Sequence, residues 1–162
     1  MKTALPLRIS MILLAVGFLV SCKTDLGELP EFNIRKSDGS KVNVQAYIKG
    51  KSSLVIHFDS DCLGCQQEAK AISDHLDEFG DVKIVFLSVQ DFDKIKVFDK
   101  YFKLSEKPNI VVGQDYTNTI TTHFKMPTTP LIALVDRDGD VRKVITGEIG
   151  IAELKSLINE IE

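Results

Sequence analysis

The 162-residue chain contains no tryptophan and only three cysteines, and its 20 Lys and Arg residues never gather into a basic run. Without such a run the chain offers nothing that could follow a phosphate backbone, which argues against a nucleic-acid partner. The sequence also has no internal repeat and no low-complexity tract. These absences exclude repeat architectures, and the length fits one domain with a sizeable core.

The N-terminal apolar run is also short. Ile9–Val20 is too short to cross a bilayer comfortably, and Lys2 and Arg8 in front of it give the positive start that is typical of a signal peptide. The run ends in Leu19-Val20-Ser21-Cys22. This segment resembles the lipobox of bacterial lipoproteins, in which the signal is cut before the cysteine and that cysteine is acylated.

The lipobox resemblance implies that residues 1–21 are removed and that Cys22 carries the lipid. The protein would then be held on a membrane outside the cytoplasm, on its periplasmic or surface face, by several acyl chains. Residues 22–30 are polar and contain Gly27 and Pro30, so we predict a short tether before one domain over residues 31–162. The alternative is an ordinary signal peptide cut near Ser21, which would leave Cys22 free.

The remaining two cysteines form the segment Cys62-Leu63-Gly64-Cys65. The apolar run Leu54–Phe58 before it predicts a buried strand. Behind it an apolar stripe at helical spacing predicts a helix that ends at Gly80. A disulfide between residues so close together closes too small a loop to stabilise a fold, so reactivity explains the pair better. The stripe consists of Cys65, Ala69, Ile72, Leu76 and Phe79.

The two cysteines are predicted to differ in role. Cys62 would stand at the first turn of the helix, where the helix dipole favours a thiolate. Cys65, one turn on, lies on the buried stripe. We therefore expect Cys62 to attack a disulfide and Cys65 to resolve the mixed disulfide that results.

The other patterns predict an α/β fold. Parallel strand–helix–strand units together with antiparallel hairpins indicate a mixed sheet with helices on both faces. Alternation around Asp38-Gly39 predicts a hairpin over Glu31–Val44, and a second hairpin is predicted over 131–146. The other predicted elements are a connector at Ala46–Lys51, strands at Val82–Val89 and Asn109–Val112, and helices at Asp91–Leu104, Tyr116–Phe124 and Ile151–Ile161.

From Glu31 onward the chain resembles thioredoxin-fold proteins of the membrane-tethered TlpA/ResA type. The resemblance is carried by the Asp-Gly hairpin, the CxxCxxE segment Cys62–Glu68, the strand–helix insertion Asn109–Phe124, and the proline segment Phe124–Pro130 that leads into a strand and a DRDG turn. It implies a thioredoxin-like mixed sheet flanked by helices, with an N-terminal hairpin and a central insertion. It also implies a thiol–disulfide oxidoreductase that acts on protein disulfides.

The resemblance assigns three further residues. Pro130 falls where the family has a cis-proline facing the CxxC pair, and it would orient the backbone of Thr129 to pair with an extended substrate. Pro127 is the alternative candidate for the cis-proline. Glu68 matches a buried acidic residue that manages protons for the resolving thiol, although a solvated helix residue is the alternative. We expect no cofactor and no metal, and a membrane thiol carrier as electron donor.

The chain departs from the family at several positions. Asp61 stands where the family usually has tryptophan, and Lys70 where it often has proline. Asp59 and Asp61 place negative charge beside Cys62, which should raise the pKa of the thiol. A less stable thiolate disfavours the reduced form, so these residues predict a reductase rather than an oxidase.

Three other functions have to be considered. The first is a binding module of an envelope assembly whose CxxC pair is vestigial. The second is copper handling, but the copper-chaperone relatives of this fold space their cysteines by three, and His57, His75 and His123 are scattered. The third is peroxidase chemistry, which would need the pattern PxxxTxxC. Val55 and Asp59 occupy those places, so we do not expect it.

Overall fold

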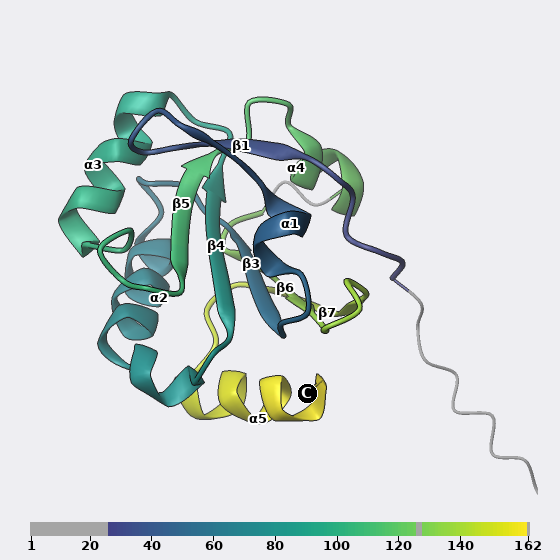
Figure 1. The fold of residues 1–162 in the computed structure, drawn as a ribbon. Helices are drawn as coiled ribbons and strands as arrows, with labels where there is room; N and C mark the ends of the chain where they lie inside the picture. Colours follow the sequence, from purple (N-terminus) through teal and green to yellow (C-terminus); the bar gives the residue numbers. More distant parts are fainter. Residues whose placement is uncertain (1–25, 126–127, 162) are drawn as a thin grey trace, which may run out of the picture.

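The computed structural model describes residues 26–125 and 128–161, which form a seven-stranded mixed sheet covered by helices on both faces (Figure 1). The strand order is β2-β1-β5-β4-β3-β6-β7. β3 pairs in parallel with β4, and β4 with β5, whereas both hairpins and the β3–β6 pair are antiparallel. The strands are β1 (Asn33–Lys36), β2 (Lys41–Asn43), β3 (Ser53–His57), β4 (Lys83–Ser88), β5 (Ile110–Gln114), β6 (Leu131–Val135) and β7 (Val141–Thr146).

The helices divide between the two faces of the sheet. α2, α3 and α5 pack on one face, and α1 and α4 pack on the other (Figure 1). Strand residues alternate between the two faces, so Leu54 and Ile56 of β3 join the core under α2, while Val55 joins the core on the opposite side. The helices are α1 (Val44–Ile48), α2 (Leu63–Asp74), α3 (Phe92–Phe102), α4 (Thr119–Phe124) and α5 (Ile151–Ile161).

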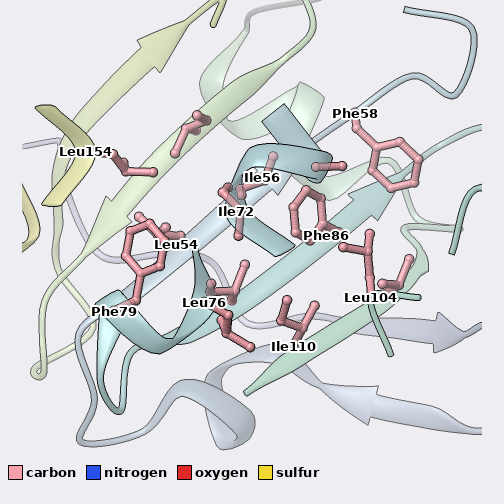
Figure 2. Packing of buried hydrophobic residues seen from close by; sticks show 14 of the residues in the cluster. Leu54, Ile56, Phe58, Ile72, Leu76, Phe79, Phe86, Leu104, Ile110 and Leu154 are labelled. Atoms are coloured by element: carbon pink, nitrogen blue, oxygen red, sulfur yellow. The ribbon is translucent and has the colours of Figure 1, made fainter. Parts of the chain in front are cut away.

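The core under α2 is the larger one and is rich in phenylalanine. Figure 2 shows part of it, including Phe58, Phe86 and Ile72 of α2. Phe58 stacks on Phe98 of α3, with 4.2 Å between the ring centroids. Phe58 directly follows β3 and is 1% exposed. This packing holds the chain firmly just before it turns toward Cys62.

The predicted N-terminal hairpin is present as β1 and β2. Its turn is closed by Asp38, whose Oδ1 accepts the Ser40 N–H at 2.8 Å. Gly39 has φ 89°, a left-handed conformation that glycine adopts without a steric penalty. The Asp-Gly pair therefore forms the hairpin turn that its position in the sequence predicts.

The segment that we expected as a connector begins as a short helix, α1. The side chain of Asn43 caps it by accepting the Ala46 N–H at 2.9 Å. Val44 and Ile48 lie one turn apart and are both buried against the sheet. A helix of five residues is too short to produce a convincing apolar period, which is why the sequence pattern did not reveal it.

The predicted long helix behind the cysteines is broken near its end. α2 stops at Asp74, and a 3₁₀ turn, η1 (Leu76–Phe79), follows. Leu76 and Phe79 remain buried, so the apolar stripe continues although the helix geometry tightens. The chain leaves this turn at Gly80, whose φ is 61°.

The predicted insertion is a part of the sheet rather than an appendage. β5 lies between β1 and β4 and pairs with both. At Gly113 a Cβ would lie 2.7 Å from the backbone oxygen of Arg35, so this close approach of β5 and β1 requires glycine.

Candidate active site

The two cysteines lie at the start of α2, just after β3 ends. Cys62 is the N-cap residue of α2, and its Sγ accepts the Cys65 N–H at 3.2 Å. Sulfur thus takes the place of the oxygen that usually satisfies the first free N–H groups of a helix. The sequence adopts this geometry because the β3 core ends at Phe58 and a polar turn, Asp59–Asp61, leads into the helix.

The polar turn is held by side chains from two other places. The Asp61 N–H donates to Asp59 Oδ1 at 2.7 Å, and Gln66 Nε2 of α2 donates to the Ser60 carbonyl at 2.8 Å. The Ser60 N–H donates to Gln90 Oε1 at 2.7 Å, beyond the end of β4. These bonds fix the chain that carries Cys62.

The structure gives the two sulfurs opposite environments. Both are free thiols; Cys62 is half-buried, whereas Cys65 is 1% exposed and packs in the core under α2. Cys65 Sγ also accepts the Asp59 N–H at 3.5 Å. The arrangement has the outward first sulfur and the inward second sulfur that the apolar stripe predicts.

Burial dominates the acidity of Cys65 and raises the pKa of this thiol to about 12. Burial also acts on Cys62, but there the hydrogen bonds from Cys65 and from the Gly64 N–H outweigh it, and the pKa of Cys62 lies below its usual value. A nucleophilic thiol needs a lowered pKa, because the thiolate is the form that attacks.

Our expectation that Asp59 and Asp61 raise the pKa of Cys62 is therefore wrong. Asp61 is paired with Lys94, whose Nζ lies 2.6 Å from its carboxylate, and Asp59 is engaged by the Asp61 N–H. Burial is the main influence that raises the pKa of Cys62, and the hydrogen bonds to the sulfur outweigh it. The charges of Asp59 and Asp61 therefore no longer support a reductase over an oxidase.

The Thr129–Pro130 bond is cis, and it lies beside Cys62. The Cys62 thiol donates to the Thr129 carbonyl, with 3.6 Å between sulfur and oxygen. Pro130 is buried, while Thr129 is partly exposed, and its N–H has no partner among the residues that the structure describes. Pro127, the rival position, lies outside the described residues.

The carboxyl group of Glu68 lies inside the protein. Glu68 is 2% exposed, and its Oε2 accepts the Ile149 N–H at 3.1 Å. Its Oε1 has no hydrogen-bond partner within the described part of the chain. Burial raises the pKa of Glu68, and the negative charge of Glu148 raises it further. Because Glu68 follows Cys65 by three residues in α2, both side chains lie on the inner face of the helix.

Sequence reasoning missed Glu148, which comes from the loop between β7 and α5. A Cβ on Gly64 would lie 2.7 Å from Glu148 Oε1, so the carboxylate rests against the CxxC turn. With its amide nitrogen turned toward Glu148, Gln67 donates to both carboxylate oxygens at 3.0 Å. Gly147 and Gly150 bracket this loop in the sequence, but nothing in the sequence indicates that it folds back onto α2.

Residues 1–25, which include the predicted signal peptide 1–21 and the predicted lipidation site Cys22, lie outside the described residues. Across 26–125 and 128–161, no group of three or more His, Cys, Asp or Glu side chains could hold a metal ion. No helix in those ranges is both long and apolar enough to cross a membrane.

Solved structures with the same arrangement of strands and helices include three from Mycobacterium tuberculosis. DsbF is 20% identical, with a TM-score of 0.70, covering 81% of this chain and 95% of that one. A secreted disulfide oxidoreductase homologous to Escherichia coli DsbE is 18% identical, with a TM-score of 0.67, covering 80% and 95%. The peroxidoxin BcpB is 17% identical, with a TM-score of 0.72, covering 86% and 98%. Similarity at these identities shows the fold alone.

The fold is therefore the thioredoxin-like α/β fold that the sequence predicts. The sequence profile of the AhpC/TSA family matches residues 27–144, and the chain belongs to this family. No curated protein sequence matches the chain significantly. The fold and the family together make it a thioredoxin-like oxidoreductase.

Proposed function

We propose that this protein exchanges disulfide bonds with partner proteins outside the cytoplasm, using Cys62 as the attacking thiol and Cys65 as the resolving thiol. One observation carries the proposal. The half-buried Cys62 caps α2 and has a lowered pKa, while Cys65, one turn on, is 1% exposed with a pKa raised to about 12. An available attacker above a shielded partner is what thiol–disulfide exchange requires.

In the reducing direction the Cys62 thiolate attacks one sulfur of a substrate disulfide. A bond forms between Cys62 and that sulfur, and the other substrate sulfur leaves as a thiolate and takes up a proton. The Cys65 thiol then loses its proton, attacks the Cys62 sulfur and releases the second substrate thiol. The substrate disulfide gains two electrons and two protons, and the two cysteines are left as a disulfide.

Glu68 and Thr129 have supporting roles in this proposal. Glu68 is the buried carboxyl group on the same face of α2 as Cys65, so we assign it the transfer of the proton that Cys65 must lose. Thr129 lies beside Cys62 and presents an N–H that has no partner within the described residues, and Pro130 holds that backbone in place. A substrate segment can add to it in an extended conformation.

The direction of electron flow depends on the reduction potential of the pair. The lowered pKa of Cys62 stabilises the reduced dithiol, so it shifts the couple toward oxidation of substrates rather than toward their reduction. In the reducing direction, a membrane thiol carrier would have to return electrons to the pair. Anchoring through Cys22 fits this location, and one protein of the same fold is described as secreted.

Reduction of insulin disulfides in the presence of a small dithiol tests the proposal. The wild-type protein should accelerate the reaction, and Cys62→Ser should reduce it to background. Cys65→Ser should accumulate mixed disulfides with partner proteins in the native cell, because the resolving step is lost. Equal background rates for wild type and Cys62→Ser, with no trapped partner, would favour the non-catalytic binding module instead.

Peroxidase activity is a second candidate, because the family match extends over residues 27–144 and a peroxidoxin shares the fold. Against it, Val55 is buried in β3 and Asp59 lies in the turn, at the places where that chemistry needs proline and threonine. Hydrogen peroxide consumption that depends on Cys62 and exceeds the rate of insulin reduction would support it.

A further inference from the structure

Two adjoining hollows lie between α2 and α3, next to the reacting cysteine, and together we call them the α2–α3 groove. Their volumes are about 530 Å³ and about 450 Å³, within the range of roughly 300–1,000 Å³ that is usual for ligand sites. Both are lined by Gln66, Tyr101 and Phe102, so they adjoin each other. Asp61 lines the first and Leu63 the second, which brings the groove to both sequence neighbours of Cys62. Figure 1 shows α2 and α3 on the same side of the sheet.

The groove gathers apolar side chains that the fold leaves in solvent. Leu63 and Val97 are each 69% exposed, and Tyr101 is 77% exposed. Phe98 and Phe102, whose ring centroids are 4.8 Å apart, complete the apolar lining. Exposed apolar side chains that gather beside a reactive group, rather than lying singly, are a common feature of binding sites.

The charges around the groove are already paired with one another. Lys94 Nζ lies 2.6 Å from the Asp61 carboxylate, and Lys96 Nζ lies 2.7 Å from Asp93. Lys70 forms an ion pair with Asp74 at the far end. These pairs leave no net charge of either sign to attract a charged group, so the groove complements an uncharged, apolar one.

We propose that the α2–α3 groove binds an aliphatic or aromatic side chain that a substrate protein carries close to its reacting cysteine. The inference rests on the proposed function and specifies which disulfides the site prefers. An extended chain advances about 3.3 Å per residue, so a side chain two to four residues from the substrate cysteine lies about 7–13 Å from the reacting sulfur. Because the groove begins at Asp61 and Leu63, the two sequence neighbours of Cys62, a side chain at that range can enter it while the substrate cysteine meets Cys62.

The test uses short peptides with a single cysteine, each presented as a mixed disulfide with glutathione. The peptides share one sequence except that leucine, serine or aspartate occupies one position, moved from four residues before the cysteine to four residues after it. The second-order rate of reaction with the reduced wild-type protein is measured by stopping the reaction with acid and separating the products. At one or two neighbouring positions the leucine peptide should react about tenfold faster than the serine peptide.

Two groove variants and one matched control complete the experiment. Val97→Ser and Tyr101→Ser change exposed side chains that line the groove, so the fold should persist. In both, the preference for leucine should fall below about twofold. Tyr116→Ser removes a tyrosine that is 45% exposed but does not line the groove, and the preference should be unchanged. Glutathione disulfide has no side chain for the groove and should react at the same rate with all four proteins.

The outcomes separate the groove from the site beside it. If the wild type reacts equally fast with all three peptides at every position, or if the groove variants keep the preference, the groove proposal is overturned while the disulfide chemistry stands. If the wild type reacts with neither the peptides nor glutathione disulfide, the proposed function itself fails, and the groove proposal with it.

Discussion

The two sides of the first turn of α2 have opposite surroundings. On the outer side the Cys62 sulfur caps the helix, touches the Thr129 carbonyl and lies next to the exposed Leu63. On the inner side Cys65 and Glu68 sit in the core with almost no contact with solvent. The pKa of the Cys62 thiol on the outer side is lowered, whereas the pKa of the Cys65 thiol on the inner side is raised. The comparison teaches that one helical turn suffices to make two identical side chains chemically different.

The largest expected effect is a difference in alkylation rate between the two sulfurs. A thiol with a pKa of about 12 is ionised in about one molecule in 100,000 at pH 7, whereas Cys62 ionises more readily than an ordinary thiol. In the folded protein, iodoacetamide should therefore modify Cys62 at least about 1,000-fold faster than Cys65. The rates are measured by mass spectrometry on Cys65→Ser and Cys62→Ser, each of which keeps one of the two sulfurs. Similar rates, before denaturant is added, would show that the two environments are not different.

The next effect concerns the carboxyl group on the inner side. Glu68→Gln keeps the size of the side chain but cannot accept the proton of Cys65, so it should slow resolution of the mixed disulfide by about 100-fold. The first attack by Cys62 should change little, because Cys62 lies on the outer side of the turn. Rapid-mixing experiments with a peptide disulfide measure the two steps separately. A variant that slows both steps equally would point to a structural role instead.

Glu68 should also make stability depend on pH. Its pKa is raised in the folded protein above the ordinary value of 4.5, mainly by burial, so it stabilises the fold fully below that value, and the contribution is lost as the pH rises through the folded pKa. Glu68→Gln lacks this dependence. Its free energy of unfolding, measured in urea between pH 4 and pH 8, should therefore improve relative to the wild type as the pH rises. A constant difference across this range would contradict the raised pKa.

The smallest effect is expected on the outer side. Gly64→Ala places a Cβ 2.7 Å from Glu148 Oε1, but this atom ends a flexible side chain that can move away. Alanine also favours a helix more than glycine does, so the free energy of unfolding should change by less than about 1 kcal/mol. The matched control is Gly113→Ala, where the Cβ meets the backbone oxygen of Arg35 at 2.7 Å and nothing can yield cheaply. That variant should lose about 1–3 kcal/mol. Chemical denaturation measures the free energy of unfolding of both variants. An equal loss of stability in the two would show that the flexible side chain and the backbone oxygen do not differ as obstacles to a Cβ.

Much of the fold could be predicted because strong periodicities coincide with burial. The terminal helix, Ile151–Ile161, has the predicted bounds, and β6 and β7 form the predicted hairpin around the DRDG turn. α1 was missed because its short length shows no period, and η1 because buried apolar spacing does not distinguish an α-helix from a 3₁₀ turn. The placement of Cys65 on the buried side also follows from spacing alone.

The electrostatics of the site could not be predicted in the same way. The sequence shows that Asp59 and Asp61 are close to Cys62 along the chain, but it does not show that Lys94, on another helix, pairs with Asp61. Nor does it show that Glu148 reaches the CxxC turn from a loop more than 80 residues away, as the Ile149–Glu68 hydrogen bond with its separation of 81 residues illustrates. Contacts between distant segments decide the charge balance, and they become visible only when the chain is folded.

The burial of Cys65 has a consequence for the order of events in a full cycle. When the pair is oxidised, the sulfur that an incoming thiol can reach is that of Cys62, because the other one lies beneath the helix. The molecule that reduces the pair again must therefore react at Cys62, where the substrate also reacts. Donor and acceptor have to take turns, and the enzyme should display ping-pong kinetics in which an excess of either one obstructs the other.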